Sequence, residues 1–560
     1  MSVVEQPPAR DISPRVFYLA LTALTLLFVA QQATYVSRFP LIMDEFVDAE
    51  AVKACLERVP YRDYPSTKTV MGYYLQAPVM AAVSDPWQAM LAVKMEMVAL
   101  AIAALIFASI RLSRHSGRTS VLVGLALIFA MSTFNERCSE LRSDMPTAVF
   151  GLIALILLID DRPLASGVLA GISLMMSQKA AYYVVSSEAA LLALVVVFRN
   201  RERLRDLFLF NIGSAASFGA YLGFWSVVAS PASVFGRTFL GPSKLAFTTY
   251  TAVPVQYWPQ TLVRNPFYYA LAITALVYLL ARGLRRDARA LLIGVFGSFL
   301  LALCIWHKQP WPYFFVILIP TLFVVQVPFI EAAIRRLHQE TPAIRRFVMT
   351  AAVILGIAIP VVSRLPTTLR RDNRFQHSMF QIGSALLATG GQYLAGTPIF
   401  YDHEQAVADE LNSIDNLERA RLWSKSPEEM RQLIRRVDAA PIKFILYNYR
   451  LRGMPPPFQM NLQSTFAPYW GDIFLYARRL GSGTFRLKFA GRYVVRTPSR
   501  SVSIDGRAVQ NGAIVQLAAG THTAQTQAPF RLAYLPTIDA RPLDPRSREY
   551  QEFFESVYTF

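Results

Sequence analysis

Long apolar segments alternate with short polar ones along the chain up to about residue 364. A helix needs about 20 residues to cross the hydrocarbon core of a bilayer, and about eleven segments approach that length. Their approximate bounds are 14–36, 87–110, 119–134, 146–159, 164–177, 181–198, 207–229, 267–281, 289–306, 312–330 and 347–363. The pattern predicts a mainly α-helical transmembrane bundle of about eleven helices, formed by residues 1–363.

Arginine residues mark alternate loops between these segments. They cluster in residues 111–118, 199–205, 282–289 and 335–346. Because lysine and arginine beside a span are held on the cytoplasmic side, we expect these loops and the N-terminus to be cytoplasmic. The external connections are then approximately residues 37–86, 135–145, 178–180, 230–266 and 307–311. Long loops gathered on one face commonly carry function, so we expect the functional residues on the external side.

The rest of the chain, residues 364–560, alternates polar and apolar positions and predicts an extracytoplasmic soluble domain. Helical and strand-like patterns are mixed over about residues 398–480, which indicates an α+β part. Turn signals at Asp505-Gly506, Asn511-Gly512 and Ala519-Gly520 separate short strand patterns farther on. We therefore expect a small β-sandwich over about residues 481–540.

Composition supports a membrane protein and narrows its partners. Hydrophobic residues make up 54% and charged residues 17% of the 560 residues, too apolar a mixture for a water-soluble chain. The net charge of +18 would suggest a nucleic-acid partner in a soluble protein. Here the cytoplasmic loops account for much of it, so we expect no nucleic acid. The three cysteines exclude a disulfide scaffold and a multi-thiolate metal cluster.

The first external loop carries two adjacent carboxylates, Asp44 and Glu45, followed by Lys68 within a tyrosine-rich stretch. A carboxylate at the membrane edge can act as a general base or orient an acceptor hydroxyl. The alternative is a solvated pair at a helix end. Lys68 can contact one particular phosphate, or it can extend to the lipid headgroups.

The second external loop contains Glu140, Arg142 and Asp144. Glu140 and Asp144 are four residues apart, so on a helix they would share a face, with Arg142 on the other side. This loop is either part of a site or a polar cap on two helices. The chain has no P-loop, dinucleotide fingerprint or zinc-protease motif, which argues against nucleotide-driven transport and metalloprotease chemistry.

Cations recur in the other external loops, at Lys179 and at His307-Lys308, close to Tyr313. Cations on the external side run against the orientation rule, and an anionic ligand such as a lipid phosphate would explain them. Anchoring at the membrane interface is the alternative. Lys94 falls within the second apolar segment, so either that helix begins later or Lys94 pairs inside the bundle.

Five short motifs occur in order on the expected external face. They are Asp44-Glu45; Pro60-Tyr61-Arg62-Asp63 with Lys68 and Tyr73-Tyr74; Arg142-Ser143-Asp144-Met145-Pro146; Gly171 with Gln178-Lys179; and His307-Lys308 with Tyr313 and Pro320. In these features the chain resembles the GT-C class of polytopic glycosyltransferases, which includes protein O-mannosyltransferases and bacterial aminoarabinose transferases to lipid A.

The resemblance implies an external active site that moves a sugar from a polyprenyl-phosphate donor to an envelope lipid, polysaccharide or protein, with inversion at the anomeric carbon. Asp44 would be the catalytic carboxylate, Glu45 its support, and Asp144 a second acid. Arg142 would hold Asp144 or the donor phosphate. The other donor-phosphate candidates are Lys68, Lys179, His307, Lys308 and Tyr313.

The resemblance also bears on cofactors and location. Some members carry an acidic residue directly before the lysine that takes part in metal binding, whereas Ser66 and Thr67 precede Lys68 here. We therefore assign no metal ligand, and a divalent metal stays an open alternative. A multi-pass protein of the bacterial inner membrane, surrounded by membrane lipids and with its C-terminal domain in the periplasm, is expected. The alternative function is a secondary transporter or flippase of an anionic lipid, although such sites usually lie near mid-membrane.

Overall fold

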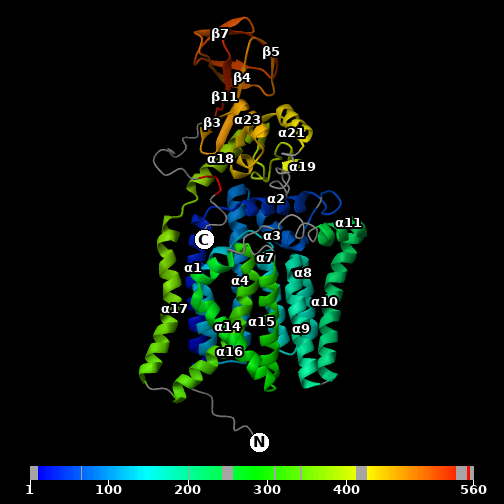
Figure 1. The fold of residues 1–560 in the computed structure, drawn as a ribbon, viewed down its shortest axis with the longest axis vertical. Helices are drawn as coiled ribbons and strands as arrows, with labels where there is room; N and C mark the ends of the chain where they lie inside the picture. The colour runs from blue at the N-terminus through cyan, green and yellow to red at the C-terminus, as the bar shows by residue number, and fades with distance from the viewer. Residues whose placement is uncertain are drawn as a thin grey trace.

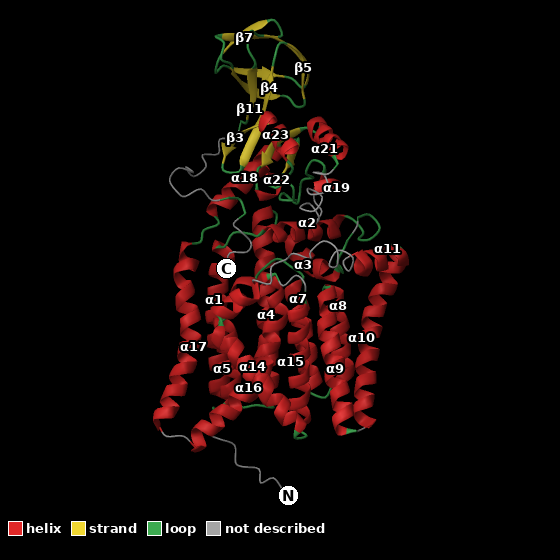
Figure 2. Ribbon diagram, viewed as in Figure 1, coloured by secondary structure: helices red, strands yellow, loops and turns green. Residues whose placement is uncertain are grey.

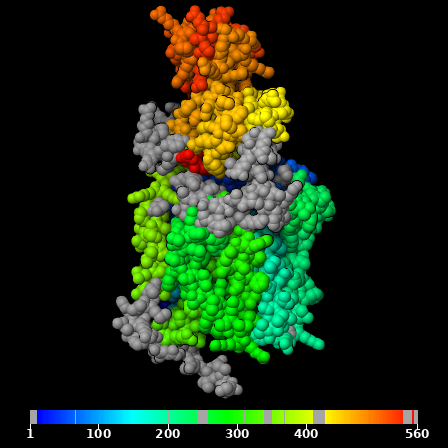
Figure 3. Space-filling view, viewed as in Figure 1, coloured from blue at the N-terminus to red at the C-terminus, as the bar shows by residue number. Residues whose placement is uncertain are grey.

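The computed structural model describes residues 11–64, 66–199, 201–241, 257–307, 311–340, 343–411, 426–537 and 552–554. Long helices run side by side in a bundle, and a strand-rich C-terminal part stands on one end of it (Figure 1). Colouring by secondary structure separates the two parts, with the strands confined to the end away from the N-terminus (Figure 2). In the space-filling view the C-terminal part is narrower than the bundle (Figure 3).

Eight helices of the described residues are long and apolar enough to cross a membrane. They belong to α1 (Pro14–Arg38), α4 (Pro86–Leu112), α9 (Ala181–Phe198), α10 (Arg201–Val228), α14 (Pro266–Leu284), α15 (Ala288–Trp306), α16 (Phe315–Glu340) and α17 (Ala343–Arg370). Three shorter apolar helices complete the set, α5 (Arg118–Ala130), α7 (Asp144–Ile159) and α8 (Pro163–Met176). The predicted transmembrane helical bundle is confirmed, and the protein is a multi-pass membrane protein.

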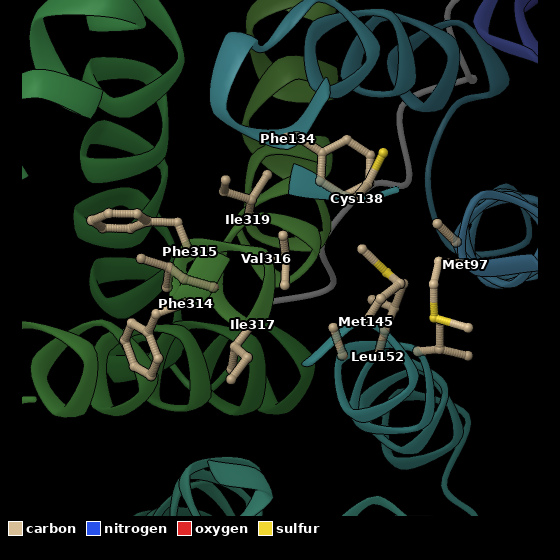
Figure 4. Close-up of a cluster of buried hydrophobic side chains, with 14 of the residues drawn as sticks. Met97, Phe134, Cys138, Met145, Leu152, Phe314, Phe315, Val316, Ile317 and Ile319 are labelled. Atoms are coloured by element: carbon tan, nitrogen blue, oxygen red, sulfur yellow. The ribbon is translucent and has the colours of Figure 1, made fainter. Parts of the chain in front are cut away.

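Close backbone contact joins α8 to α10. A Cβ atom on Gly167 would lie 2.0 Å from the carbonyl oxygen of Phe210, and one on Gly171 would lie 2.7 Å from that of Ser214. Small residues four apart allow two membrane helices to approach in this way. Elsewhere, α16 lies in the middle of the bundle against α7 and α6, where Val316 and Ile319 belong to a buried cluster (Figure 4).

The first predicted external loop folds into two helices across the end of the bundle, α2 (Met43–Glu57) and α3 (Met71–Ala82). The start of α2 is fixed by Glu45, whose carboxylate accepts a 2.8 Å hydrogen bond from the backbone N–H of Ile42. Short helices complete this end of the bundle: α6 (Ser132–Arg137), η1 (Gln178–Ala180), α11 (Pro231–Phe235), η2 (Gly236–Leu240), α13 (Tyr257–Arg264) and η3 (Pro312–Phe314).

The C-terminal part begins with α18 (Arg374–Ala388) and contains the helices α19 (Ala408–Leu411), α21 (Pro427–Ala439), α22 (Tyr449–Arg452) and α23 (Pro456–Thr465). Its strands are β1 (Gln392–Leu394), β2 (Ile442–Leu446), β3 (Phe466–Trp470), β4 (Ile473–Leu480), β5 (Gly483–Leu487), β6 (Gly491–Arg496), β7 (Ser501–Ile504), β8 (Arg507–Gln510), β9 (Ile514–Leu517), β10 (Gly520–Gln525) and β11 (Phe530–Leu535). The predicted α+β domain with a strand-rich end is therefore present.

Two sheets organise these strands. One has seven strands in the order β1-β2-β4-β11-β6-β9, with β3 also paired to β4, and the other has four in the order β5-β10-β7-β8. Strand β4 pairs with β2 and β3 over its first half and with β11 over its second half. The sheet consequently continues across residue 480, where the sequence suggested a division between an α+β part and a sandwich.

Aromatic side chains dock the C-terminal part onto the bundle. Phe46 of α2 contacts the rings of Phe380, Phe553 and Phe554. Gln376 of α18 binds both backbone groups of Leu41, each at 2.8 Å. The start of α2 is therefore held from both sides, by the bundle and by the C-terminal part.

Candidate active site

Acidic and basic side chains alternate in a row where α2, α7 and η1 meet at one end of the bundle. A carboxylate oxygen of Asp44 lies 2.5 Å from Nη1 of Arg142. The Nε atom of Arg142 lies 3.0 Å from Asp144, and the other oxygen of Asp144 lies 2.5 Å from Nζ of Lys179. Four of the candidate residues from three separate loops are therefore in one continuous network.

Local structure sets the direction of each of these groups. Asp44 is in the first turn of α2, and Asp144 begins α7. Residues 138–143 between α6 and α7 form turns and bends, not a helix. The expectation that Glu140 and Asp144 share a helix face is therefore wrong. The irregular backbone lets Arg142 turn back onto Asp144, while Glu140 pairs with Arg137 at 2.7 Å.

A second ion pair lies on the next turn of α2. Lys68 binds Asp48 at 2.9 Å, and the hydroxyl group of Tyr73 donates to the same carboxylate oxygen at 3.1 Å. Asp48 was not among the predicted site residues. The feature of the sequence that could have identified it is its four-residue spacing from Asp44. That spacing places both carboxylates on one face once residues 43–57 are recognised as helical.

Glu45 points away from this network, into the bundle. Its carboxylate lies 2.7 Å from Nζ of Lys94 and accepts a 3.1 Å hydrogen bond from the backbone N–H of Leu141. Lys94 therefore pairs inside the bundle, which was one of the two alternatives for it. The contact with Leu141 joins the start of α2 to the segment that carries Arg142.

Aromatic rings lie against the cationic side chains of the site. The guanidinium carbon of Arg142 lies 3.4 Å from the ring centroid of Tyr313, and Nζ of Lys179 lies 4.8 Å from it. His307 stacks on Phe314 with ring centroids 4.1 Å apart and shares a 2.8 Å hydrogen bond with Tyr182. Tyr313 thus contacts the network directly, whereas His307 stacks on Phe314, the residue that follows Tyr313. Lys308 lies outside the described residues.

Exposure divides the carboxylates into two groups. The side chain of Asp44 is 26% exposed, whereas those of Glu45, Asp48 and Asp144 are at most 4% exposed. Lys68 and Lys179 are similarly open, at 28% and 25%. An incoming molecule can therefore reach Asp44, Lys68 and Lys179. Each of the two lysines is bound by a buried aspartate.

The surroundings of Asp44 favour its ionised form. Burial opposes ionisation, but the charges of Arg142, Lys68 and Arg450 and the hydrogen bond from Arg142 outweigh it and lower the pKa of Asp44. Arg450 comes from α22 of the C-terminal part, where it and Tyr449 lie against the thioether of Met43. The C-terminal part consequently contributes to the electrostatics of the site.

Within the described ranges, no three His, Cys, Asp or Glu side chains come together as a metal site would require. Each of Asp44, Asp48 and Asp144 is already bound to a cation of the protein. These carboxylates do not fit a metal ion in this arrangement, and no catalytic step is assigned to one.

No family model matches the sequence, and no curated protein matches it. Among solved structures, the chain is similar to the apo crystal structure of ArnT, an aminoarabinose transferase from Cupriavidus metallidurans. The TM-score is 0.52 at 11% sequence identity, with 73% of this chain and 91% of that chain covered.

Two further structures align less well. ArnT from Cupriavidus metallidurans bound to undecaprenyl phosphate gives a TM-score of 0.47 at 14% identity, over 63% of this chain and 66% of that one. The cryo-EM structure of arabinosyltransferase EmbB from Mycobacterium smegmatis gives 0.37 at 12% identity, over 58% and 32%. The chain thus spans just under two thirds of the first and about a third of the second. The likeness to apo ArnT shows that this chain has the fold of the GT-C glycosyltransferases, as the sequence motifs predicted.

Proposed function

We propose that this protein is an integral membrane glycosyltransferase that moves a sugar from a polyprenyl-phosphate donor to an envelope lipid, polysaccharide or protein. The observation that carries the proposal is the group formed by Asp44, Lys68 and Lys179. One accessible carboxylate and two accessible ammonium groups lie at one end of an apolar bundle. This is the combination that acceptor activation and phosphate departure require.

The chemistry follows from the charges. The acceptor hydroxyl attacks the anomeric carbon of the sugar on the face opposite the phosphate, and Asp44 takes the hydroxyl proton. The bond between the sugar and the phosphate oxygen breaks, and the phosphate keeps the electron pair. Lys68 and Lys179 stabilise the charge that develops on that oxygen, because preorganised cations act most strongly where charge appears in the transition state. Attack from the opposite face inverts the anomeric centre.

The buried carboxylates have a different role. Asp48 and Asp144 hold Lys68 and Lys179 in place, and Glu45 fixes the turn that carries Asp44. Arg142 is bound to Asp44 and Asp144 and is stacked on Tyr313, so it sets the distance between the base and Lys179. Arg142 is therefore a positioning residue in this proposal.

A lipid-linked donor suits the location of the site. A polyprenyl chain remains in the bilayer while its phosphate stays at headgroup level, beside the ends of the membrane helices. ArnT, whose apo structure has this fold, is known with undecaprenyl phosphate bound. We propose the same class of lipid here, with the arginine-rich turns cytoplasmic, the site periplasmic and the protein in the inner membrane.

The test compares envelope lipids and glycans by mass spectrometry in cells that express the wild type, Asp44→Asn or no protein. We expect a sugar addition that depends on the wild-type chain and falls by about 100-fold or more in Asp44→Asn, the scale of losing a general base. The control is Glu57→Gln, an exposed carboxylate at the other end of α2, which should retain the addition.

Two results would contradict the proposal. Full sugar addition by Asp44→Asn would remove Asp44 from the reaction. The flippase alternative would be favoured if the wild type moved labelled undecaprenyl phosphate across the membrane of proteoliposomes and transferred no sugar to any envelope component.

A further inference from the structure

A groove of about 280 Å³ lies between α14 and α17, on a different part of the bundle from the network around Asp44. Its apolar wall includes Leu127, Phe267, Leu355 and Ile359, and its polar end includes Arg364. From Leu355 to Arg364 the helix rises by about 14 Å, at 1.5 Å per residue. The groove is therefore amphipathic along its length, with its cation near the end of α17 that leads to the C-terminal part.

Helix α17 stands at the side of the bundle (Figure 1). Leu355 and Ile359 are 54% and 60% exposed, although both line the groove. At Gly356 the helix touches α14, since a Cβ atom there would lie 2.6 Å from the ring of Phe267. The two helices meet at this point and leave an apolar groove beside it, on a surface that lies against lipid in a membrane.

Arg364 has an unused donor. Its side chain is buried, with 6% of the residue exposed. Its Nε atom donates to the carbonyl oxygen of Pro360 and its Nη2 atom to that of Ala130. Its Nη1 atom is buried without a hydrogen-bond partner, and the carboxylate of Glu136, whose charge acts on Arg364, is already bound to Arg264. A buried guanidinium with no anion bound to its free donor is costly, so the geometry calls for one.

The other polar groups at this end are already engaged. Asn265 accepts hydrogen bonds from the backbone N–H and the hydroxyl group of Ser132. Arg264 forms a two-pronged ion pair with Glu136, at 2.7 and 3.0 Å. Among these groove residues, Arg364 is the one that has both a positive charge and a spare donor.

We propose that this groove binds an anionic phospholipid, with its phosphate on Arg364 and an acyl chain along Leu355 and Ile359. Charge complementarity selects the phosphate, and the apolar wall below it selects a chain that extends toward the bilayer centre. Phospholipids are the anionic molecules that surround an exposed membrane helix, which is why we choose them over a polyprenyl phosphate. The bound lipid would join α17, which leads through α18 to the C-terminal part, to the rest of the bundle.

The test is native mass spectrometry of the purified full-length protein with phosphatidylglycerol or phosphatidylcholine of the same acyl chains. We expect the wild type to retain phosphatidylglycerol preferentially. Arg364→Gln should weaken that retention about tenfold, since hydrogen bonds to charged groups are strong. Ser363→Phe, which fills the groove without removing the cation, should weaken it to a similar degree, and it keeps the test valid if Arg364→Gln does not fold.

Matched controls are available on the same helices. Val362→Phe adds the same bulk to an exposed position of α17 outside the groove lining, and Arg285→Gln removes an exposed arginine just after α14. Both should keep wild-type retention. Equal retention of the two lipids, or unchanged retention in Ser363→Phe, would overturn the proposal. Displacement of phosphatidylglycerol by an equal amount of undecaprenyl phosphate would overturn the choice of a phospholipid.

Discussion

The ammonium group of Lys94 lies 2.7 Å from the carboxylate of Glu45, and both side chains are at most 5% exposed. This buried pair connects α4 to the first turn of α2. Because Glu45 also binds the backbone of Ile42 and Leu141, the pair fixes the two segments that carry Asp44 and Arg142. The geometry of the exposed site therefore depends on a contact within the bundle.

Removing Lys94 should destabilise the protein more than removing a surface lysine. Lys94→Met leaves the Glu45 carboxylate buried without its cation, which costs about 3–5 kcal/mol. Thermal unfolding in detergent measures the effect. Lys53→Met is the control, because the Lys53–Glu57 pair is exposed and contributes about 1 kcal/mol or less. A further Glu45→Leu change should restore part of the loss, and equal melting temperatures for the two single variants would contradict this prediction.

The pH dependence of transfer should reveal the influence of Arg142 on Asp44. In the wild type the lowered pKa keeps Asp44 ionised, and able to accept a proton, as the pH falls below the ordinary range of an aspartate. Arg142→Gln removes the largest favourable charge, so the pKa of Asp44 rises and activity is lost at a higher pH on the acidic side.

The acidic limb of kcat/KM against pH measures this shift. Arg62→Gln, which removes an exposed arginine paired with Asp63, should leave the limb in place. If Arg142→Gln lowers the rate at every pH by the same factor and leaves the limb unmoved, Arg142 does not act through the charge state of Asp44.

Glu140 should make stability fall as the pH rises. Burial, together with the neighbouring charge of Glu45, outweighs the attraction of Arg137 and raises the pKa of Glu140 from 4.5 to about 7. The folded state then holds a proton that the unfolded state releases, so the contribution of Glu140 to stability is greatest below pH 4.5 and is lost as the pH rises toward and through 7. In Glu140→Gln this contribution is absent, and the melting temperature should fall less between about pH 5 and pH 8. An unchanged pH dependence, matching that of Glu57→Gln, would contradict the assignment.

The sequence predicted the bundle well because long apolar runs have no other stable location than a membrane. It predicted the charged residues of the external loops and offered the contact of Arg142 with Asp144, but it did not predict the pairs of Asp44 with Arg142, of Asp48 with Lys68 or of Asp144 with Lys179. In α2 the buried face carries Glu45 and Asp48, so hydrophobic periodicity, which assumes apolar residues inside, does not identify that helix. The pairing of Asp48 with Lys68 depends on how α2 and α3 fold across the bundle, and no local pattern records that contact.

The last helix shows a similar limit. The apolar run was expected to end at residue 363, but α17 continues to Arg370. An arginine normally marks the end of a span, whereas Arg364 is buried beside Ala130 because its side chain binds backbone carbonyl groups there. Charge alone cannot distinguish an arginine at a membrane boundary from one that lines a groove.

The contact between α8 and α10 should not tolerate even one additional carbon atom. In Gly167→Ala the new Cβ would lie 2.0 Å from the carbonyl oxygen of Phe210, so the two helices must separate. Overpacking of this kind costs about 1–3 kcal/mol, which thermal unfolding in detergent would detect. Gly219→Ala on α10 is the matched control, because no atom lies within 4 Å of its added Cβ. That variant should be as stable as the wild type or up to about 1 kcal/mol more stable, since alanine favours a helix over glycine. Equal stability of the two variants would show that the backbones of α8 and α10 are not in contact at Gly167.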